Sequence, residues 1–232
     1  TVASTIDADA DGSIDGYAIT FSENVDDGTL NIGLLSIGSE TNPVYVTGTG
    51  DDSSATITFD DGTSDTATTP DITTSGAGLI DDFATTPVSM VQIAADTITE
   101  TDGAAPALLT AVASDNTNDI DGIDSDDTVV LTFSEAISDP SITNLNIDTI
   151  LGLGGSSWLD DSSAIGSAVW SSDTITVTLN DFSGSLPDVA VGDTITPTSV
   201  ITDGTNAMGG DTATISGNFD DITAPEISSA ST

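Results

Sequence analysis

The sequence contains no positively charged side chain. Its 232 residues include no lysine, arginine or histidine but 39 acidic residues, giving a formal net charge of −39. Nucleic acid is excluded as a partner because its phosphates must be neutralised by cations, and an anionic membrane surface is disfavoured for the same reason. Without histidine or lysine there is no Ser-His-Asp triad, Ser-Lys pair or Schiff base. The only catalytic chemistry left is that of a carboxylate pair, as in glycosidases. The sequence gives no indication of a deep cleft for such a pair, so we expect that the chain is not an enzyme.

Cysteine and long apolar runs are also missing. The absence of cysteine excludes disulfides, thiolate catalysis and cysteine-ligated zinc. No run approaches the ~18 apolar residues of a membrane-spanning helix. The sequence has neither an initiator methionine nor a signal peptide, so Thr1 suggests a processed or excised segment. We expect an extracellular or cell-surface location.

What is present favours strands and turns. Hydrophobic residues make up 37% of the chain, enough for a packed core, and Thr, Ser, Val, Ile, Gly and Asp dominate. Apolar residues alternate in short segments that Gly, Asp, Ser or Pro clusters separate. The alternating positions are Tyr17, Ile19 and Phe21; Val44 and Val46; Ile57 and Phe59; Val129, Leu131 and Phe133; and Ile175, Val177 and Leu179. The pattern predicts an all-β protein of two tandem β-sandwiches.

The sequence contains an internal repeat. Residues 1–23 and 110–135 each run from a VAS segment through an Asp-rich loop into a strand that ends in TFSE. The two TFSE motifs lie 112 residues apart. We therefore predict one domain over 1–103 and a second over 104–222, with a Gly/Pro-containing linker near 101–106.

The C-terminal residues resemble the linker. The sequence DDITAPEISSAST at 220–232 is similar to TDGAAPALLTAVAS at 101–114. Residues 223–232 therefore look like the first strand of a following domain, and the domain over 1–103 is expected to lack its own first strand. Either the tail of one subunit complements the next by strand addition, or the chain is a fragment of a longer polypeptide. A frayed tail is the third alternative.

The loop DADADGSID at 7–15 predicts a calcium site. Its Asp residues stand at relative positions 1, 3, 5 and 9 with Gly at 6, as in the EF-hand ligand loop. Position 12 lacks the bidentate Glu, and the following residues predict a strand instead of a helix. The predicted ligands are Asp7, Asp9, Asp11, the main-chain carbonyl of Ser13, Asp15 and, at the end of the next strand, Glu23.

The second domain offers further oxygen ligands, so we expect several Ca²⁺ ions. Its loop DNTNDIDGIDSDD corresponds to the first loop in a looser form, and ITDGTNAM forms an additional Asp/Asn turn. The predicted ligands are Asp115, Asn118, Asp119, Asp121, Asp124, Asp126, Glu135, Asp203 and Asn206, with Asp102, Asp220 and Asp221 where successive domains meet. Neighbouring carboxylates repel by about 1 kcal/mol per close pair even in water, a cost that calcium reverses.

Several motifs resemble a known family. "APALLTAVAS…DGIDSDDTVVLTFSEAI" and "ITDGTNAM" are similar to bacterial and archaeal Ig-like repeats of surface-layer proteins, extracellular filaments and large adhesins. The resemblance covers most of 104–222 and, more loosely, 1–103. It implies Ig-like sandwiches, rigidified by calcium, in a structural extracellular protein that assembles head to tail with copies of itself or lies among adjacent repeats.

An adhesin stalk or a carbohydrate-binding module that contacts cell-surface glycans is the alternative function. The candidate sugar-stacking residue is Trp158, in a Gly/Ser-rich segment, although a structural role is favoured for it. Trp170 alternates with Ala168 and is expected in the core.

Overall fold

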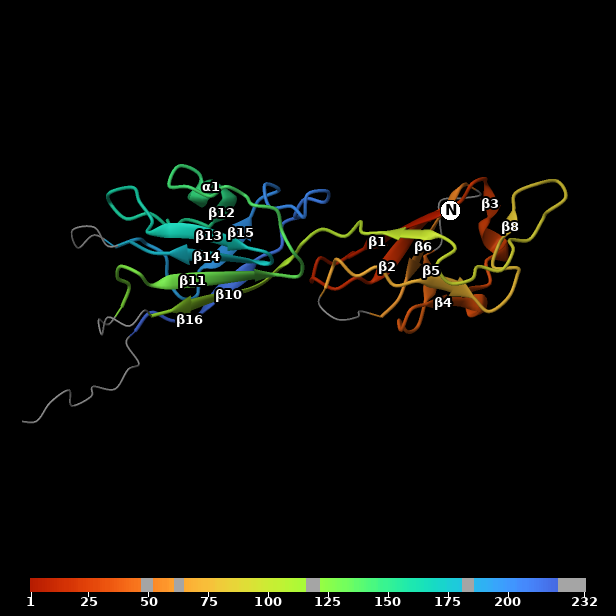
Figure 1. The fold of residues 1–232 in the computed structure, drawn as a ribbon, viewed down its shortest axis with the longest axis horizontal. Helices are drawn as coiled ribbons and strands as arrows, with labels where there is room; N and C mark the ends of the chain where they lie inside the picture. Colours follow the sequence, from red (N-terminus) through yellow and green to blue (C-terminus); the bar gives the residue numbers. More distant parts are fainter. Residues whose placement is uncertain (47–51, 61–64, 116–121, 181–185, 221–232) are drawn as a thin grey trace, which may run out of the picture. The chain divides into compact units, whose positions relative to one another are not determined.

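The computed structural model describes residues 1–46, 52–60, 65–115, 122–180 and 186–220. Nearly all regular structure in these ranges is β (Figure 1), and their only α-helix is the four-residue α1, Ile147–Ile150. Within the same ranges, no helix has the length and apolarity needed to cross a membrane. The prediction of an all-β chain is therefore confirmed. The chain forms two compact units, Thr1–Ala107 with Asp203–Ala207, and Leu108–Thr202 with Met208–Thr232.

The first unit contains a sheet in the order β5-β6-β2-β1-β9. Two shorter pairs, β3 with β8 and β4 with β7, complete its strands as described. Short 3-10 turns cover Asp27–Thr29 and Ile32–Leu34. The strand bounds are β1 Val2–Ile6, β2 Gly16–Thr20, β3 Val25–Asp26, β4 Leu35–Ile37, β5 Val44–Val46, β6 Ser54–Thr58, β7 Ile72–Thr74, β8 Asp81–Asp82 and β9 Thr99–Thr101.

The second unit contains a larger sheet in the order β12-β15-β16-β10-β11-β14-β13. The helix α1 directly precedes β12 in the chain. The strand bounds are β10 Leu108–Ser114, β11 Thr128–Phe133, β12 Leu151–Gly152, β13 Ser167–Ser171, β14 Thr174–Thr178, β15 Thr194–Pro197 and β16 Ala213–Asn218.

The two units share a five-strand arrangement. The order β5-β6-β2-β1-β9 in the first unit corresponds to β13-β14-β11-β10-β16 in the second. In each, the first three neighbouring pairs are antiparallel and the last is parallel. Thr20 of the first TFSE motif pairs with Val2, and Thr132 of the second pairs with Thr110. The repeated motif thus occupies the same position in the same local topology.

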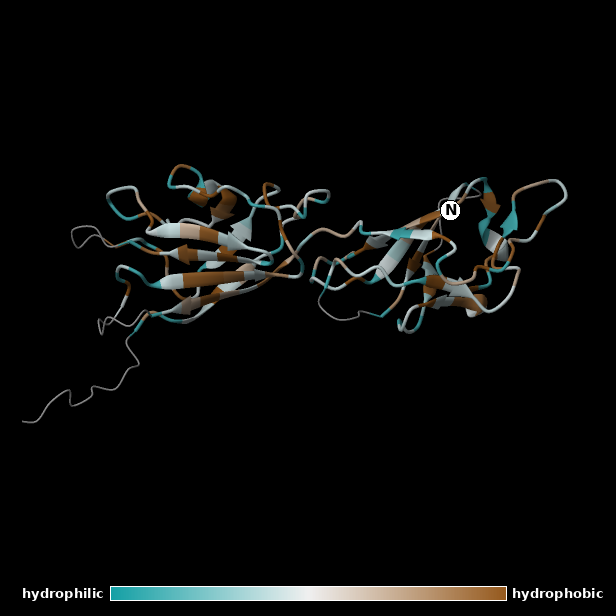
Figure 2. Ribbon diagram, in the orientation of Figure 1, coloured by the Kyte–Doolittle hydropathy of each residue, from teal (hydrophilic) through white to brown (hydrophobic). Residues whose placement is uncertain are grey.

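The cores follow the predicted alternation (Figure 2). In the first unit Tyr17, Ile19 and Ile57 are buried, and in the second so are Leu131 and Val177. Strand β5 is the exception, because the residues predicted to face the core are exposed and the residue between them packs against it. Val44 and Val46 are 56% and 44% exposed, whereas Tyr45 packs against the core. Because β5 is the last strand of its sheet, its alternating apolar residues do not show which face is covered.

The two tryptophans differ in burial. Trp158 is fully buried, and its indole Nε1 donates to the Leu151 carbonyl at 2.6 Å. This burial confirms the structural role and removes Trp158 as a surface for stacking sugars. The expectation that Trp170 lies in the core is wrong. Trp170 is 41% exposed on β13, where the sheet ends, and its Nε1 donates to the Ile137 carbonyl at 2.9 Å.

The parallel pair of the second unit depends on a glycine. Gly217 in β16 lies opposite Ala113 in β10 and has φ +90°. A Cβ atom there would come within 2.2 Å of the Ala113 carbonyl oxygen. Only glycine combines this backbone conformation with so close an approach.

Candidate metal centres

The loop between β1 and β2 gathers three carboxylates. One oxygen from each of Asp7, Asp9 and Asp11 lies within 4.8 Å of the other two, and Asp9 and Asp11 are exposed. The backbone folds around Asp7, whose carboxylate accepts from Gly12 N at 2.9 Å and Asp11 N at 3.3 Å. Gly12 has φ +90°, as the sharp turn requires. These acidic groups can hold a metal ion.

The loop between β10 and β11 gathers another three. Oxygens of Asp115, Asp124 and Asp127 lie within 4.8 Å of one another. Asp124 is 4% exposed and Asp127 is fully buried. Asp127 also accepts from the Asp124 backbone N–H at 3.0 Å. Burial makes carboxylate repulsion stronger than it is in the first loop, because the surroundings screen charge less than water does.

The two loops occupy equivalent places in the repeat. Asp7 directly follows β1 and Asp115 directly follows β10, while Asp15 and Asp127 directly precede β2 and β11. The carbonyls of Asp15 and Asp127 also accept equivalent bonds, from Phe59 N at 2.8 Å and Leu179 N at 2.7 Å. Both units therefore present acidic residues at the same end of the same hairpin.

The structure separates one predicted ligand from the first loop. Ser13 and Asp15 stay in the loop, where Ser13 N donates to Asp11 and Asp15 accepts from Ala8 N at 3.1 Å. Glu23 does not reach it. In the antiparallel hairpin β2 runs away from the loop, so its end pairs with the start of β1. Glu23 instead lines a cavity with Thr1 and Phe21.

The other predicted ligands that the structure describes do not belong to these two groups of three carboxylates. Asp126 is exposed with φ +81° and is not one of the three clustered residues of its loop. Glu135 is buried, at 6% exposed, in the second unit, and Asp220 is exposed. Four further predictions, Asn118, Asp119, Asp121 and Asp221, lie outside the described residues.

The turn at Asp203 confirms a local Asp/Asn pairing. The Asp203 carboxylate accepts from Asn206 N at 2.6 Å and from the Asn206 side-chain amide at 2.8 Å. Burial alone would raise the pKa of Asp203. The hydrogen bonds from Asn206 and from Thr205 N outweigh it, so the pKa of Asp203 is lowered. An oxygen of Asp102 lies within 4.8 Å of one from Asp203 in the first unit.

Two buried carboxylates, Asp127 and Asp160, were not predicted from the sequence. Asp127 stands in the DSDDT run, where its position directly before a strand was the available signal. Asp160 stands before two serines and forms a closed turn, accepting from the Ser162 hydroxyl at 2.6 Å and from Asn180 at 2.7 Å. The hydrogen bond from the Ser162 hydroxyl is the largest cause that lowers the pKa of Asp160, to about 2. Burial opposes this shift, and the hydrogen bonds from Ala164 N and Asn180 add to it. Its role is structural.

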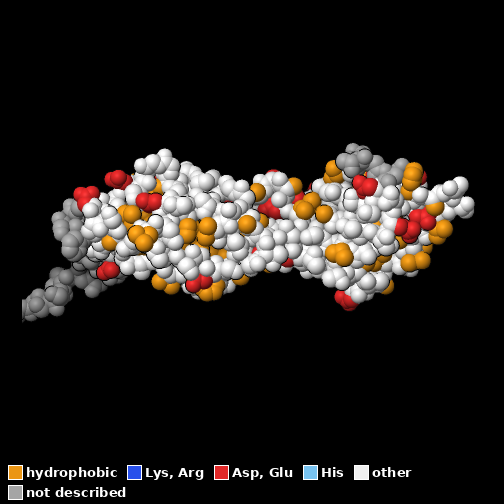
Figure 3. Space-filling model, turned by 90° about the horizontal axis from the view of Figure 1, so that it is seen from above, with side chains coloured by type: hydrophobic (Ala, Val, Ile, Leu, Met, Phe, Trp, Pro, Cys, Tyr) orange, Lys and Arg blue, Asp and Glu red, His pale blue; other side chains and the backbone are white. Residues whose placement is uncertain are grey.

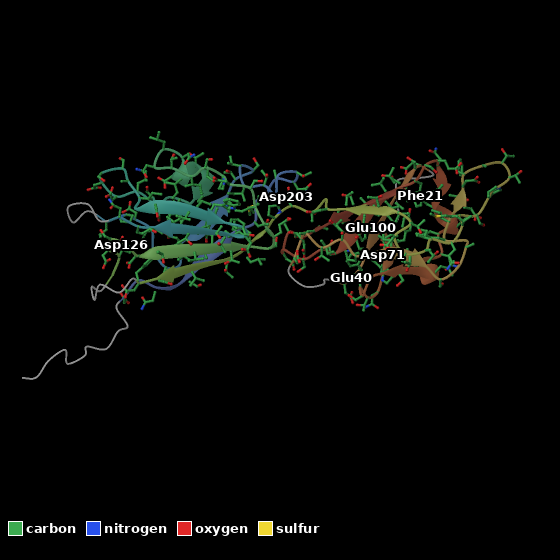
Figure 4. The ribbon with its side chains drawn as sticks, in the orientation of Figure 1. Phe21, Glu40, Asp71, Glu100, Asp126 and Asp203 are labelled. Carbon is green, nitrogen blue, oxygen red and sulfur yellow. The ribbon has the colours of Figure 1, made fainter. Side chains whose placement is uncertain are left out.

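Acidic side chains also surround Tyr17 in the first unit. Burial, followed by the charges of Glu100, Asp71 and Glu40 (Figure 4), raises the pKa of Tyr17 well above its usual range. Its hydroxyl donates to the Pro70 carbonyl at 2.7 Å. The phenol therefore stays protonated and serves as a hydrogen-bond donor.

The first loop makes the stability of the metal-free protein depend on pH in an unusual direction. Burial raises the pKa of Asp7, despite hydrogen bonds from Gly12, Ala10 and Asp11. The native state then holds this proton more tightly than the unfolded state, so stability decreases as pH rises from about 4 through the raised pKa. Asp160 and Asp203 act oppositely and lose their contribution below about pH 4.

We expect acidification in EDTA from pH 7 to about pH 4 to raise the thermal midpoint of the first unit, because Asp7 with its raised pKa takes up its proton within this range. Asp7→Asn should flatten that rise, whereas the exposed Asp188→Asn in the second unit should leave it unchanged. Calorimetry across this pH range measures both. A midpoint that falls steadily on acidification in every variant would contradict the role of Asp7.

Acidic side chains are spread over the surface as well as clustered in these loops. Figure 3 shows them in small separate groups across one face. No family model, curated protein or solved structure matches the chain. Any functional argument therefore depends on the repeat and on its carboxylates.

Proposed function

We propose that the chain is a structural extracellular protein, a calcium-stabilised Ig-like repeat unit of a surface layer, filament or sheath. One observation carries this proposal: the same hairpin loop in both units brings together three carboxylates, in a chain with no basic side chain. No lysine, arginine or histidine can neutralise them, so a divalent cation is the natural partner. Calcium suits them because it accepts six to eight oxygen ligands in flexible geometry.

The proposed role of calcium is mechanical. In the first loop the ion would hold the turn that follows β1, and in the second it would tie the residue after β10 to those before β11. The first centre would use Asp7, Asp9 and Asp11, and the second Asp115, Asp124 and Asp127. Magnesium fits less well because it retains its waters and needs near-octahedral geometry.

Calcium titration followed by calorimetry tests the two centres. We expect binding to the wild-type chain with Kd in the range of about 0.1–1 mM typical of extracellular modules. Asp9→Asn and Asp127→Asn should each weaken one class of site by at least about tenfold, because loss of outer-shell partners alone costs about 10–100-fold.

The matched control for this titration is Asp188→Asn. It removes one exposed carboxylate that belongs to neither loop and should leave both classes of site unchanged. If all three variants weakened calcium binding equally, the binding would be a general effect of net charge and not a property of the two loops. Absence of binding to the wild type would refute the proposal.

A further inference from the structure

Strand β13 is the longest strand at an end of the two larger sheets. It has five residues, Ser167–Ser171, whereas the other end strands β5, β9 and β12 have three, three and two. Proteins usually protect an open strand edge by keeping it short or by placing charged residues or proline on it. β13 (Figure 1) reads SAVWS, with neither charge nor proline, in a chain of 39 acidic residues. The usual protection is therefore missing at this edge.

The outward main-chain groups of β13 belong to Ala168 and Trp170. The turn to β14 has two residues, so Ser171 and Thr174 form the hydrogen-bonded pair next to it. Because bonded pairs alternate along an antiparallel ladder, Val169 also bonds to β14, while Ala168 and Trp170 direct their N–H and C=O groups away from it. Across the described ranges, no hydrogen bond from outside the ladder reaches these main-chain groups. They can therefore bond to a further strand.

The side chains of β13 present apolar surface on both faces of the sheet. Val169 is 57% exposed on the outer face. Trp170 is 41% exposed on the opposite face, which it shares with the partly buried Ala168. These two residues line a small cavity together with Ile142 and Ile175. A large exposed side chain thus lies two positions from a small one on the same face.

We propose that β13 pairs antiparallel with β13 of a second copy of this chain, with Val169 at the centre. In this register Ala168 of each copy lies opposite Trp170 of the other, so the outward main-chain groups of both residues exchange hydrogen bonds. The indole of each copy covers Ala168 of the other, and the two Val169 side chains meet on the outer face. The contact is self-complementary, as a twofold-symmetric interface requires.

Charge decides where two copies can meet. Copies of net charge −39 repel each other, so close approach requires surfaces without carboxylates. β13 and its neighbour β14 provide such a surface, because their sequences, SAVWS and TITVT, contain no acidic residue. A basic partner would instead be attracted to the acidic loops. The self-complementary register points to a copy of the chain and not to an unrelated neutral strand.

This contact goes beyond the proposed function, since it uses neither of the two carboxylate loops. Each copy uses its one β13 edge, so the pairing closes as a dimer and does not grow into a chain. A single pair of short strands is much smaller than the interface of about 1,200–2,000 Å² that a stable complex buries. We therefore expect weak association that requires high protein concentration.

Sedimentation equilibrium of the full chain in EDTA tests the contact without calcium. The buffer contains sodium chloride at about 1 M, where the screening length is about 3 Å and repulsion between copies is suppressed. We expect a monomer–dimer equilibrium for the wild type. Val169→Glu places two carboxylates opposite each other and should weaken the dimer at least about tenfold. Val191→Glu, at a residue 46% exposed in the second unit, is the matched control and should dimerise as the wild type does.

A proline variant separates strand pairing from contact between side chains alone. Ala168→Pro removes one outward N–H and leaves the hydrogen bonds to β14 in place, as proline on the open side of an edge strand does. We expect it to weaken the dimer as strongly as Val169→Glu does. The thermal midpoint of the monomer should stay close to that of the wild type.

A disulfide version covers the case in which Ala168→Pro fails to fold. Because the chain has no cysteine, Val169→Cys introduces the only thiol. Facing residues of a non-hydrogen-bonded pair have Cα atoms about 4.5 Å apart, a separation that a disulfide can bridge. Oxidation should therefore give a covalent dimer. Val112→Cys, at a residue 39% exposed on the same outer face but on β10, should oxidise clearly more slowly.

Three results would overturn the proposal. The first is a wild type that stays monomeric at every concentration. The second is a dimer that both Val169→Glu and Ala168→Pro retain, which assigns the interface elsewhere. The third is a chain that does not dimerise but whose Trp170 a neutral oligosaccharide shields from acrylamide quenching, which assigns this surface to a glycan. None of these results changes the calcium titration, so the proposed function is tested separately.

Discussion

Calcium should raise the thermal midpoint of each unit by about 10–20 °C relative to EDTA. One site filled at a hundredfold excess over Kd contributes about 2.7 kcal/mol. A change of 1 kcal/mol shifts the midpoint of a domain of this size by about 4–8 °C. The effect is large because the three carboxylates of each loop lie within 4.8 Å of one another, so ion binding also removes their mutual repulsion.

Scanning calorimetry at matched ionic strength measures this shift. Sodium chloride is the necessary control, since a chain of charge −39 gains stability from any salt through screening. Asp9→Asn should reduce the calcium shift of the first unit alone, and Asp127→Asn that of the second alone. If sodium chloride reproduced the full shift, the loops would be ordinary acidic turns.

Trp158→Ala should destabilise the second unit by about 3–5 kcal/mol, the usual cost of removing a large aromatic side chain from a core. The indole is fully buried and donates to the Leu151 carbonyl. The Trp158 backbone N–H also donates to Asp148 at 2.9 Å, which fixes the segment after β12. Trp158→Phe keeps most of the packing and should cost about 1–3 kcal/mol, since it leaves that carbonyl without its donor.

Fluorescence makes this measurement specific to one unit. Both tryptophans of the chain lie in the second unit, so Trp170 continues to report its denaturant unfolding when Trp158 is replaced. Trp170→Ala, at a residue 41% exposed, is the paired control and should cost clearly less. Equal losses for the two alanine variants would contradict the assignment of Trp158 as the main aromatic of this core.

Local pattern predicted the strands and the first acidic loop well. The alternation of apolar residues identified β2, β6, β11 and β14 because each of these strands has one buried face. The DxDxDG spacing correctly placed Asp7, Asp9 and Asp11 together because these residues are close in the sequence. The repeated TFSE motif correctly indicated that one strand arrangement occurs twice. These features depend on residues close in the chain, which a sequence shows directly.

The features that the sequence did not predict depend on contacts between strands that are distant in the chain. The exposure of Val44 and Val46 follows from the end position of β5 in its sheet, and that of Trp170 from the end position of β13. Glu23 was assigned to the first loop because the sequence does not show in which direction β2 runs relative to that loop. Asp127 was missed because Asp115 comes close to it only when β10 and β11 pair.

The parallel pairing of the first and last strands of each unit has a mechanical consequence. In the second unit the chain enters through β10 and leaves after β16, and these two strands lie side by side in the same direction, from Ala111 opposite Ile215 to Ser114 opposite Asn218. Tension applied at the two ends of this unit pulls the strands in opposite senses along their length. The hydrogen bonds between them are then loaded together in shear and cannot open one at a time. β1 and β9 are also paired in parallel, so both units present this geometry to a stretching force.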